Sequence, residues 1–153
     1  MRIPVRHLKW ARFSPSPPPG LKASRPRGRK RQGVKYELAA HEHFRSLFPG
    51  WRANQWIHFS DASGARWCQP DGFADLGDRL LLVEFKYQHT AEAWEQLRLV
   101  YGPLLEYIFG KRVVILETVK WFDCAVVCPE PVNLVADPRE WAGEALGVHI
   151  WRP

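Results

Sequence analysis

Apolar side chains recur at every third or fourth position in two long stretches, residues 34–48 and 91–109. This spacing places them on one face of an amphipathic helix, so the sequence predicts a helix over each stretch. Pro103 removes one backbone hydrogen bond from the second helix and is expected to kink it. A shorter helix is predicted for residues 137–146, because Asp137 can cap its start and a proline follows at the first helical position.

Five shorter runs are rich in aromatic and branched residues and are bounded by turn-forming residues, which is typical of strands. They are residues 51–59, 66–76, 80–87, 113–116 and 124–128. The first three are separated only by short turns and are expected to form a meander. The predicted order is therefore α-β-β-β-α-β-β-α. It indicates an α/β fold in one domain, residues 33–153.

Charge is distributed unevenly along the chain, which has 153 residues and a formal net charge of +6. Residues 1–32 contain ten basic side chains and no acidic one, so residues 33–153 hold 12 basic and 16 acidic groups, a net charge of −4 (12 minus 16). Residues 1–32 also hold six of the thirteen prolines. Such a composition does not bury a core, and we expect a flexible, disordered basic arm attached to a mildly acidic domain.

The arm ends in a dense basic cluster formed by Arg25, Arg27, Arg29, Lys30 and Arg31. These side chains are predicted to bind nucleic-acid phosphates, because Lys and Arg displace counterions from the backbone. A solubilising tail or an organelle-targeting peptide is the alternative interpretation. The prolines argue against the amphipathic helix of a transit peptide.

No stretch approaches the roughly 20 consecutive apolar residues of a membrane-spanning helix, and the chain start lacks the apolar core of a secretory signal. The sequence therefore predicts a cytoplasmic or otherwise intracellular protein that is not secreted and has no membrane partner. Three cysteines, Cys68, Cys124 and Cys128, suit neither a disulfide framework nor a four-ligand zinc or iron–sulfur site. We interpret them as buried thiols.

The second and third predicted strands contain the residues most informative about chemistry. Gly77 and Asp78 suit the two-residue turn of a hairpin, and such a turn makes the numbers of cross-strand partners sum to 155. Asp71 then lies directly opposite Glu84 (71 + 84), and Lys86 points to the same face two residues later. The sequence therefore predicts a cluster of two carboxylates and one ammonium group.

Two adjacent carboxylates in a half-buried sheet repel each other unless a cation lies between them, and Mg²⁺ prefers oxygen ligands of this kind. A metal held there would polarise a phosphate oxygen and activate a water, while Lys86 could orient that water or stabilise negative charge. The alternative places Glu84 and Lys86 on the solvent-exposed face of an edge strand, but this strand is apolar on both faces. Asp75 lies about 13 Å from Asp71 along its strand, too far to share an ion with Glu84.

Pro70-Asp71, followed by Glu84-Phe85-Lys86, resembles the signature of the PD-(D/E)XK nuclease superfamily. The resemblance leaves out only the arm and the last predicted helix. It implies a restriction-endonuclease-like α-β-β-β-α-β core, with a mixed central sheet flanked by helices. It also implies DNA cleavage that depends on Mg²⁺, with Mn²⁺ able to substitute, and with Asp71, Glu84 and the backbone carbonyl of Phe85 as metal ligands.

The same resemblance implies two further site residues. The first helix of such nucleases often supplies a glutamate that helps to bind the metal, and Glu37 occupies the corresponding place. RecB-type members commonly have a glutamine and a tyrosine one turn apart in the helix after the motif, and Gln96 and Tyr101 look similar. Their separation is five residues rather than four, about 140° on a regular helix, so only Gln96 is expected to reach the site. The iron–sulfur cluster of some members needs four cysteines and is not expected here.

Aromatic residues offer weaker candidates for nucleic-acid binding. Trp67, Trp94 and Trp121 could stack on the bases of a single strand, although eight tryptophans in a small domain are more simply explained by packing. His89 could contact a phosphate, but a loop histidine needs no such role.

The leading hypothesis from the sequence is a Mg²⁺-dependent nuclease that hydrolyses phosphodiester bonds of DNA. The alternative is a nucleic-acid-binding module that retains the nuclease fold but is weak or inactive as a catalyst. The sequence leaves three questions open: whether RNA is the target instead of DNA, whether cleavage starts at an end, and whether the protein forms a homodimer.

Overall fold

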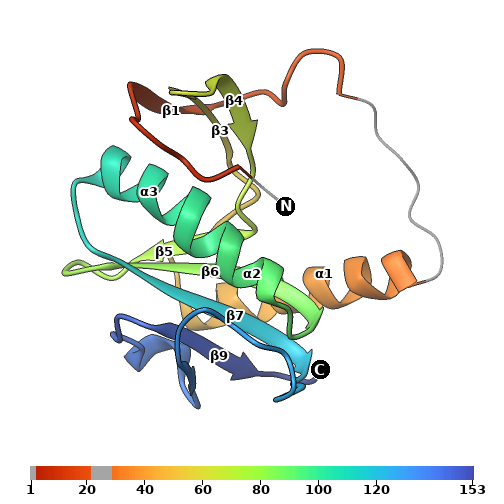
Figure 1. Cartoon of the computed structure of the whole chain (residues 1–153). Helices are drawn as coiled ribbons and strands as arrows, with labels where there is room; N and C mark the ends of the chain where they lie inside the picture. The colour runs from red at the N-terminus through yellow and green to blue at the C-terminus, as the bar shows by residue number, and fades with distance from the viewer. Residues whose placement is uncertain (1–2, 22–28) are drawn as a thin grey trace.

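The computed structural model describes residues 3–21 and 29–153 and has an α/β architecture (Figure 1). Its largest element is a mixed six-stranded sheet in the order β2-β5-β6-β7-β9-β8. The strands are β2 (Arg52–Ala53), β5 (Gly72–Asp75), β6 (Leu80–Gln88), β7 (Val113–Trp121), β8 (Val132–Leu134) and β9 (Leu146–Ile150). β2, β5 and β6 pair antiparallel, whereas β6, β7, β9 and β8 pair parallel. The predicted α/β class and mixed central sheet are confirmed.

Helices cover both faces of this sheet (Figure 1). They are α1 (Arg29–Leu47) on one face, and on the other a continuous run of α2 (Ala91–Glu95), the π-helical segment η1 (Gln96–Tyr101) and α3 (Gly102–Phe109). Both long predicted helices therefore form, and the first begins at Arg29 rather than at residue 34.

Strand β6 is buried on both faces, as its unbroken apolar sequence predicted. Leu81 and Val83 pack in the cluster that contains Phe44 of α1, whereas Leu80 and Leu82 belong to the cluster that contains Leu104 of α3. Since successive strand side chains alternate between faces, these two clusters also determine which face each polar residue later in β6 occupies.

The helix that contains Pro103 has a π-helical turn, η1, directly before the proline. Pro103 has no N–H to donate to the carbonyl of Leu99, and that carbonyl accepts a hydrogen bond from Val5 N at 2.9 Å. One residue before the proline, Gly102 N–H bonds to Leu97 O, five residues back. A Cβ at Gly102 would approach Leu97 O to 2.7 Å, so this position requires glycine.

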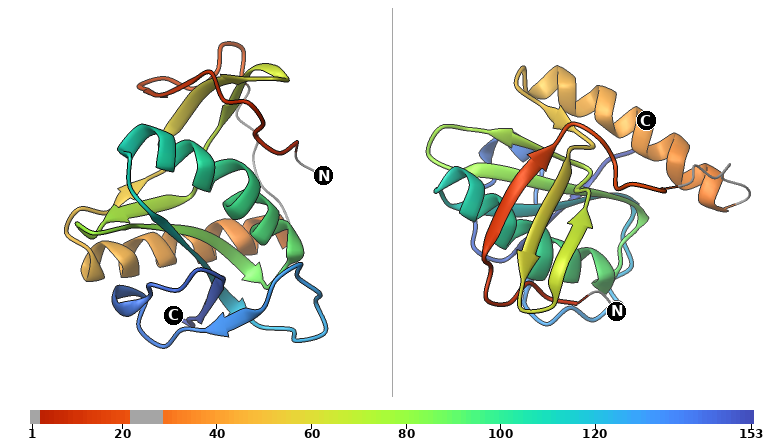
Figure 2. Two further views of the ribbon diagram at one scale, coloured as in Figure 1. Left: turned by 60° about the vertical axis from the view of Figure 1, so that its left-hand side comes forward. Right: turned by 90° about the horizontal axis from the view of Figure 1, so that it is seen from above.

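A second, three-stranded antiparallel sheet lies beside α3 (Figure 2). Its strands are β1 (Trp10–Ser14), β3 (Trp56–Asp61) and β4 (Gly64–Cys68), in the order β1-β3-β4. The prediction of an arm without secondary structure over residues 1–32 is therefore wrong for this segment. Phe13 and Ala11 pack against the core, and pairing with β3 satisfies the backbone groups of β1. Arg25 and Arg27 of the predicted basic cluster lie outside the described residues.

Two predicted strands are each divided between the sheets, so the predicted meander is wrong. The run 51–59 breaks at Asn54, whose φ of 54° bends the chain between β2 and β3. The run 66–76 breaks at Pro70, which cannot donate a ladder hydrogen bond, between β4 and β5. The hairpin predicted between the second and third runs is confirmed and is formed by β5 and β6.

The C-terminal predictions need the largest corrections. Asp137 caps a helix as expected, accepting from Arg139 N at 3.0 Å, but the helix is only the 3₁₀ turn η2 (Pro138–Glu140). The chain becomes extended at Trp141, whose indole donates to Ile115 O at 2.9 Å and lies against Gly147 of β9. The strand predicted for residues 124–128 is a set of turns.

The cysteine prediction holds in part. Cys68 is buried, Cys128 is half-buried and Cys124 is exposed, because the segment expected to be a buried strand lies at the surface. Across residues 3–21 and 29–153, no helix combines the length and hydrophobicity needed to cross a bilayer.

Candidate functional site

The β5–β6 hairpin has the register that the sequence predicted. Asp75 pairs with Leu80 and Gly72 with Val83, around a turn in which Gly77 has a φ of 93°. One step beyond the last pair, Asp71 stands opposite Glu84. Phe85 N–H donates to Asp71 Oδ2 at 2.7 Å, which fixes this carboxylate against the backbone of β6.

Glu84 and Lys86 lie on the face of the sheet that is covered by the helices following β6. They alternate with Val83 and Phe85, which pack on the α1 side. Glu84 is only 5% exposed, and Lys86 Nζ lies 3.8 Å from Glu84 Oε1. A buried carboxylate is thus held beside a partly exposed ammonium group.

The environment of Asp71 disfavours its charged form. Burial and, second, the negative charge of Glu37 raise the pKa of Asp71 to about 7, against the opposing effects of the Phe85 N–H and the Lys86 charge. Glu37 is therefore within electrostatic range of Asp71. A cation at this point would relieve the repulsion between the two carboxylates.

Glu37 is positioned by the packing of α1. Its Oε1 lies 3.7 Å from His41 Nε2 one turn later, and its side chain is 35% exposed. The His41 ring is buried, with Nδ1 accepting from the indole of Trp51 at 3.1 Å and its edge against Phe85. The histidine therefore connects α1 to the strand that bears the site.

Gln96 lies at the start of the π-helical segment and is 2% exposed. Its Nε2 donates to Glu92 Oε1 at 3.2 Å, while its buried Oε1 has no hydrogen-bond partner among the described residues. A buried acceptor without a hydrogen-bond partner destabilises the fold, and proteins keep such groups mainly at binding sites.

The π-helical segment changes the relationship between Gln96 and Tyr101. On a regular α-helix a separation of five residues places two side chains on different faces, as the sequence analysis assumed. In a π-helix the hydrogen bonds join residues five apart, so such a pair stands one turn apart. Gln96 and Tyr101 are the first and last residues of η1 and both are buried. The angle of about 140° that argued against Tyr101 therefore does not apply in this segment, although Tyr101 packs in the core cluster that contains Leu104.

Glu117 of β7 is a third buried carboxylate that the sequence analysis did not single out. It pairs with Glu84 in the parallel β6–β7 register and is fully buried. Its carboxylate contacts His89 Nδ1 and accepts from Thr90 N at 3.3 Å. Burial raises the pKa of Glu117, while His89 and Lys86 act in the opposite direction. The repeated pattern of four aliphatic residues followed by glutamate, at residues 80–84 and 113–117, could have revealed it.

Two cavities with shared lining residues open beside Lys86 and Tyr87. One, of about 480 Å³, is lined by Gln32, Lys86, Tyr87, Gln88 and Thr90. The other, of about 260 Å³, shares Gln32 and Tyr87 and adds Lys35 and Lys120. The charged residues that line the two cavities are all lysines. Lys30 and Arg31, predicted to bind phosphates, are exposed on α1 just before Gln32.

Asp75 is excluded from this cluster, as expected. It lies at the far end of β5 and accepts from Lys111 Nζ at 2.9 Å and from Gly77 N at 2.9 Å. Within the described part of the chain, no group of three or more His, Cys, Asp or Glu side chains forms a metal site. With Glu37 included, the ligand set implied by the resemblance has three carboxylates and a backbone carbonyl, and Glu37, Asp71 and Glu84 do not form such a group here. The raised pKa of Asp71 fits a position that a cation would occupy.

Comparison with protein-family models, with curated proteins and with solved structures finds no match to this chain. The functional argument therefore depends on the geometry of Asp71, Glu84 and Lys86 and on the resemblance of their motif.

Proposed function

We propose that the protein is a metal-dependent nuclease of the PD-(D/E)XK type that hydrolyses phosphodiester bonds of DNA. The main supporting observation is the register of the β5–β6 hairpin, which brings Asp71 opposite Glu84 with Lys86 on the same face as Glu84. A pKa of about 7 for Asp71 is expected of a carboxylate whose site is completed by a cation.

In this proposal Asp71, Glu84 and the backbone carbonyl of Phe85 hold Mg²⁺ or Mn²⁺, and Glu37 helps to bind the ion. The bound ion would supply Lewis-acid stabilisation of a phosphate oxygen and a more acidic water. The Lys86 ammonium orients the attacking water and stabilises negative charge that develops on the phosphate. The unpartnered Oε1 of Gln96 accepts a hydrogen bond from Lys86 or from the substrate.

The π-helical segment adds support to the RecB-type assignment. A five-residue spacing between Gln96 and Tyr101 departs from the expected motif, and the π turn restores their one-turn relationship. The lysine-lined cavities beside Lys86 offer a path for a phosphate backbone toward the site.

A matched pair of aspartate variants tests the proposal. Asp71→Asn keeps an acceptor for Phe85 N–H but removes the charge, so we expect cleavage of linear and circular DNA in Mg²⁺ to fall at least 100-fold. Asp75→Asn changes the same strand outside the site and is expected to leave cleavage unchanged. Equal activity of the two variants, or no cleavage by the wild type on duplex, single-stranded and branched DNA, would refute the proposal.

An absence of cleavage by the wild type on all of these DNA substrates would favour the alternative, a nucleic-acid-binding module. Such a module would bind DNA with an affinity that neither Mg²⁺ nor Glu84→Gln alters. Gel-shift titrations with and without Mg²⁺ separate the two functions.

A further inference from the structure

The three-stranded sheet β1-β3-β4 has one covered and one uncovered face. Ile57, Phe59 and Cys68 point to the core beneath α3. Because side chains alternate along a strand, the residues next to these three in sequence point to the opposite face, together with the residues that pair with them on the neighbouring strands. The larger side chains on this opposite face are Trp10, Arg12, Trp56, His58 and Trp67. Seen from above, the three strands lie in front of the helices, and none of the elements in the described residues lies over them (Figure 2). We call this surface the aromatic face.

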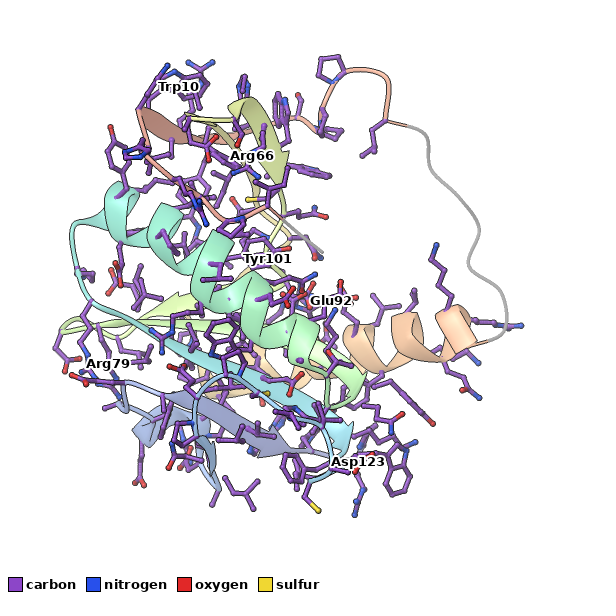
Figure 3. The ribbon with its side chains drawn as sticks, in the orientation of Figure 1. Trp10, Arg66, Arg79, Glu92, Tyr101 and Asp123 are labelled. Carbon is purple, nitrogen blue, oxygen red and sulfur yellow. The ribbon has the colours of Figure 1, made fainter. Side chains whose placement is uncertain are left out.

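Aromatic rings cross all three strands of the aromatic face. His58 and Trp67 are direct cross-strand partners whose rings stack at 4.1 Å between centroids and 8° between planes. Trp10 meets the other side of His58 edge-on at 4.8 Å. Because β4 is an edge strand, no further strand of this sheet packs beside Trp67. Trp10 lies at the outer surface of the molecule (Figure 3).

The charges around these rings are almost all positive. The guanidinium of Arg12, which is exposed, lies 5.0 Å from the centroid of the Trp10 ring, and Lys9, the residue before Trp10, is also exposed. Asp61 is the one acidic residue in the segments 3–21 and 52–69. It is buried and bound to Arg66 at 2.6 Å and to two backbone N–H groups, so it does not offset the surface charge.

We propose that the aromatic face binds single-stranded nucleic acid, with bases stacked on Trp67 and Trp10 and phosphates paired with Arg12 and Lys9. Stacking platforms with neighbouring cations are how proteins hold single strands, whereas the bases of a duplex are already stacked on each other. The cationic surroundings favour a polyanion over an apolar protein partner.

The aromatic face also adjoins the candidate site. Trp67 precedes Asp71 by four residues, so their Cα atoms are at most about 14 Å apart. Binding of a single strand to the aromatic face does not require nuclease activity, but the consequence for cleavage rests on the proposed nuclease function. If the protein is that nuclease, its substrate is DNA with a single-stranded segment that passes from the aromatic face to Asp71 and Glu84.

Binding is measured without metal, so that it does not depend on cleavage. Anisotropy of a labelled oligothymidylate in EDTA is followed for the wild type and for Trp67→Ala, Trp67→Phe, Trp10→Ala and Leu134→Ala. Leu134 is 66% exposed and lies on β8 in the other sheet, so its variant controls for loss of an exposed apolar side chain. We expect Trp67→Ala to raise the Kd about 5-fold to 100-fold, Trp67→Phe to restore most of the affinity, Trp10→Ala to weaken binding as well, and Leu134→Ala to have little effect. Circular dichroism confirms that each variant is folded.

The outcomes separate the inference from the proposed function. Trp67-dependent binding by a protein that cuts no DNA would support the aromatic face and refute the nuclease. Cleavage of DNA together with unchanged binding by Trp67→Ala and Trp10→Ala would support the nuclease and refute the aromatic face as a binding site. Tighter binding of duplex than of single strand, or an equal loss with Leu134→Ala, would overturn the inference. It would also be overturned if Trp67→Ala lowered the affinity for an acidic protein but left the affinity for oligothymidylate unchanged.

Discussion

Glu84 and Glu117 lie side by side on the parallel strands β6 and β7, in register and almost completely buried. Each follows four aliphatic residues, so both strands change from apolar to acidic at the same level of the sheet. Burial raises the pKa of both Asp71 and Glu117, and the charge of Lys86, two residues after Glu84, acts in the opposite direction on both. The ammonium group therefore interacts electrostatically with carboxylates on both sides of β6.

Replacing Lys86 by methionine is expected to abolish most of the cleavage activity. The variant keeps the length of the side chain but removes the charge that orients water and faces the phosphate, so we expect a fall of about 100-fold or more in the single-turnover rate. Lys111→Met removes a lysine bound to Asp75 outside the site and should cut normally. A Lys86→Met variant as fast as Lys111→Met would show that the ammonium has no catalytic role.

Asp71 gives the metal-free protein a stability that declines with rising pH. Its pKa is about 7 in the folded chain, above the ordinary value of 3.8, so between these values the folded state holds a proton that the unfolded state has lost. The contribution is present below about pH 4 and is lost as the pH rises through 7, by at most about 4 kcal/mol. Urea unfolding in EDTA should therefore show that Asp71→Asn gains stability over the wild type at pH 8 but not at pH 4.

Asp75 supplies the opposite sign as a control. Its pKa is lowered by the N–H of Gly77 and by Lys111, so its contribution is present above the ordinary aspartate pKa and is lost as the pH falls below it. Asp75→Asn should destabilise the protein slightly at pH 8.

Cleavage and Mg²⁺ affinity of the wild type should both increase as the pH rises through 7, because the ion binds the ionised form of Asp71. A flat Mg²⁺ affinity between pH 5.5 and 8 would contradict the assignment.

Gln96→Leu is expected to separate activity from stability. The substitution removes a buried Oε1 that has no partner among the described residues, and the lost hydrogen bond to Glu92 is partly exposed. We expect the free energy of unfolding to stay the same or rise by about 1 kcal/mol, while cleavage falls about tenfold or more. Urea denaturation and cleavage assays on the same preparation check this. A destabilised variant with normal cleavage would mean that Gln96 is only a structural residue.

The sequence predicted the β5–β6 hairpin well because local rules determine it. A glycine that tolerates a positive φ fixed the turn, and the turn fixed the register down to Gly72 and Val83. The apolar run of β6 likewise indicated its burial. The roles implied for Glu37 and Gln96 came from the family resemblance and not from periodicity.

Other features depend on distant contacts and could not be predicted in this way. Trp10–Ser14 becomes a strand only because β3 provides hydrogen bonds and α3 provides a surface for Phe13. The carbonyl of Leu99, to which Pro103 has no N–H to donate, accepts a hydrogen bond from Val5, which is distant in the chain. The short helix at Pro138 ends because Trp141 bonds to β7. Local propensity alone contains none of this information.

Gly102→Ala tests whether the π turn matters to the site. The new Cβ would meet Leu97 O at 2.7 Å, so the turn must shift and we expect a loss of about 1 to 3 kcal/mol in the free energy of unfolding. Gln96 lies in the same turn, so cleavage should fall by more than the loss of folded protein accounts for. Gly33→Ala in α1 meets no atom within 4 Å and should instead stabilise by about 0.5 to 1 kcal/mol. A stabilising Gly102→Ala would refute the tight approach to Leu97.

The basic residues at the start of α1 are expected to supply affinity rather than chemistry. Deleting residues 1–32 does not test this, because β1 belongs to the fold and its loss would expose Phe59 and Ile57. The double variant Lys30→Ala, Arg31→Ala removes two exposed charges next to Gln32, which lines both cavities. If both side chains contact phosphates, the slope of log Kd against log salt should fall by about 1.4 to 1.8, with KM raised and kcat unchanged. Arg45→Ala, at the other end of α1 and paired with Glu42, should leave the slope unchanged, and an equal effect of the two changes would show that the contribution is not local.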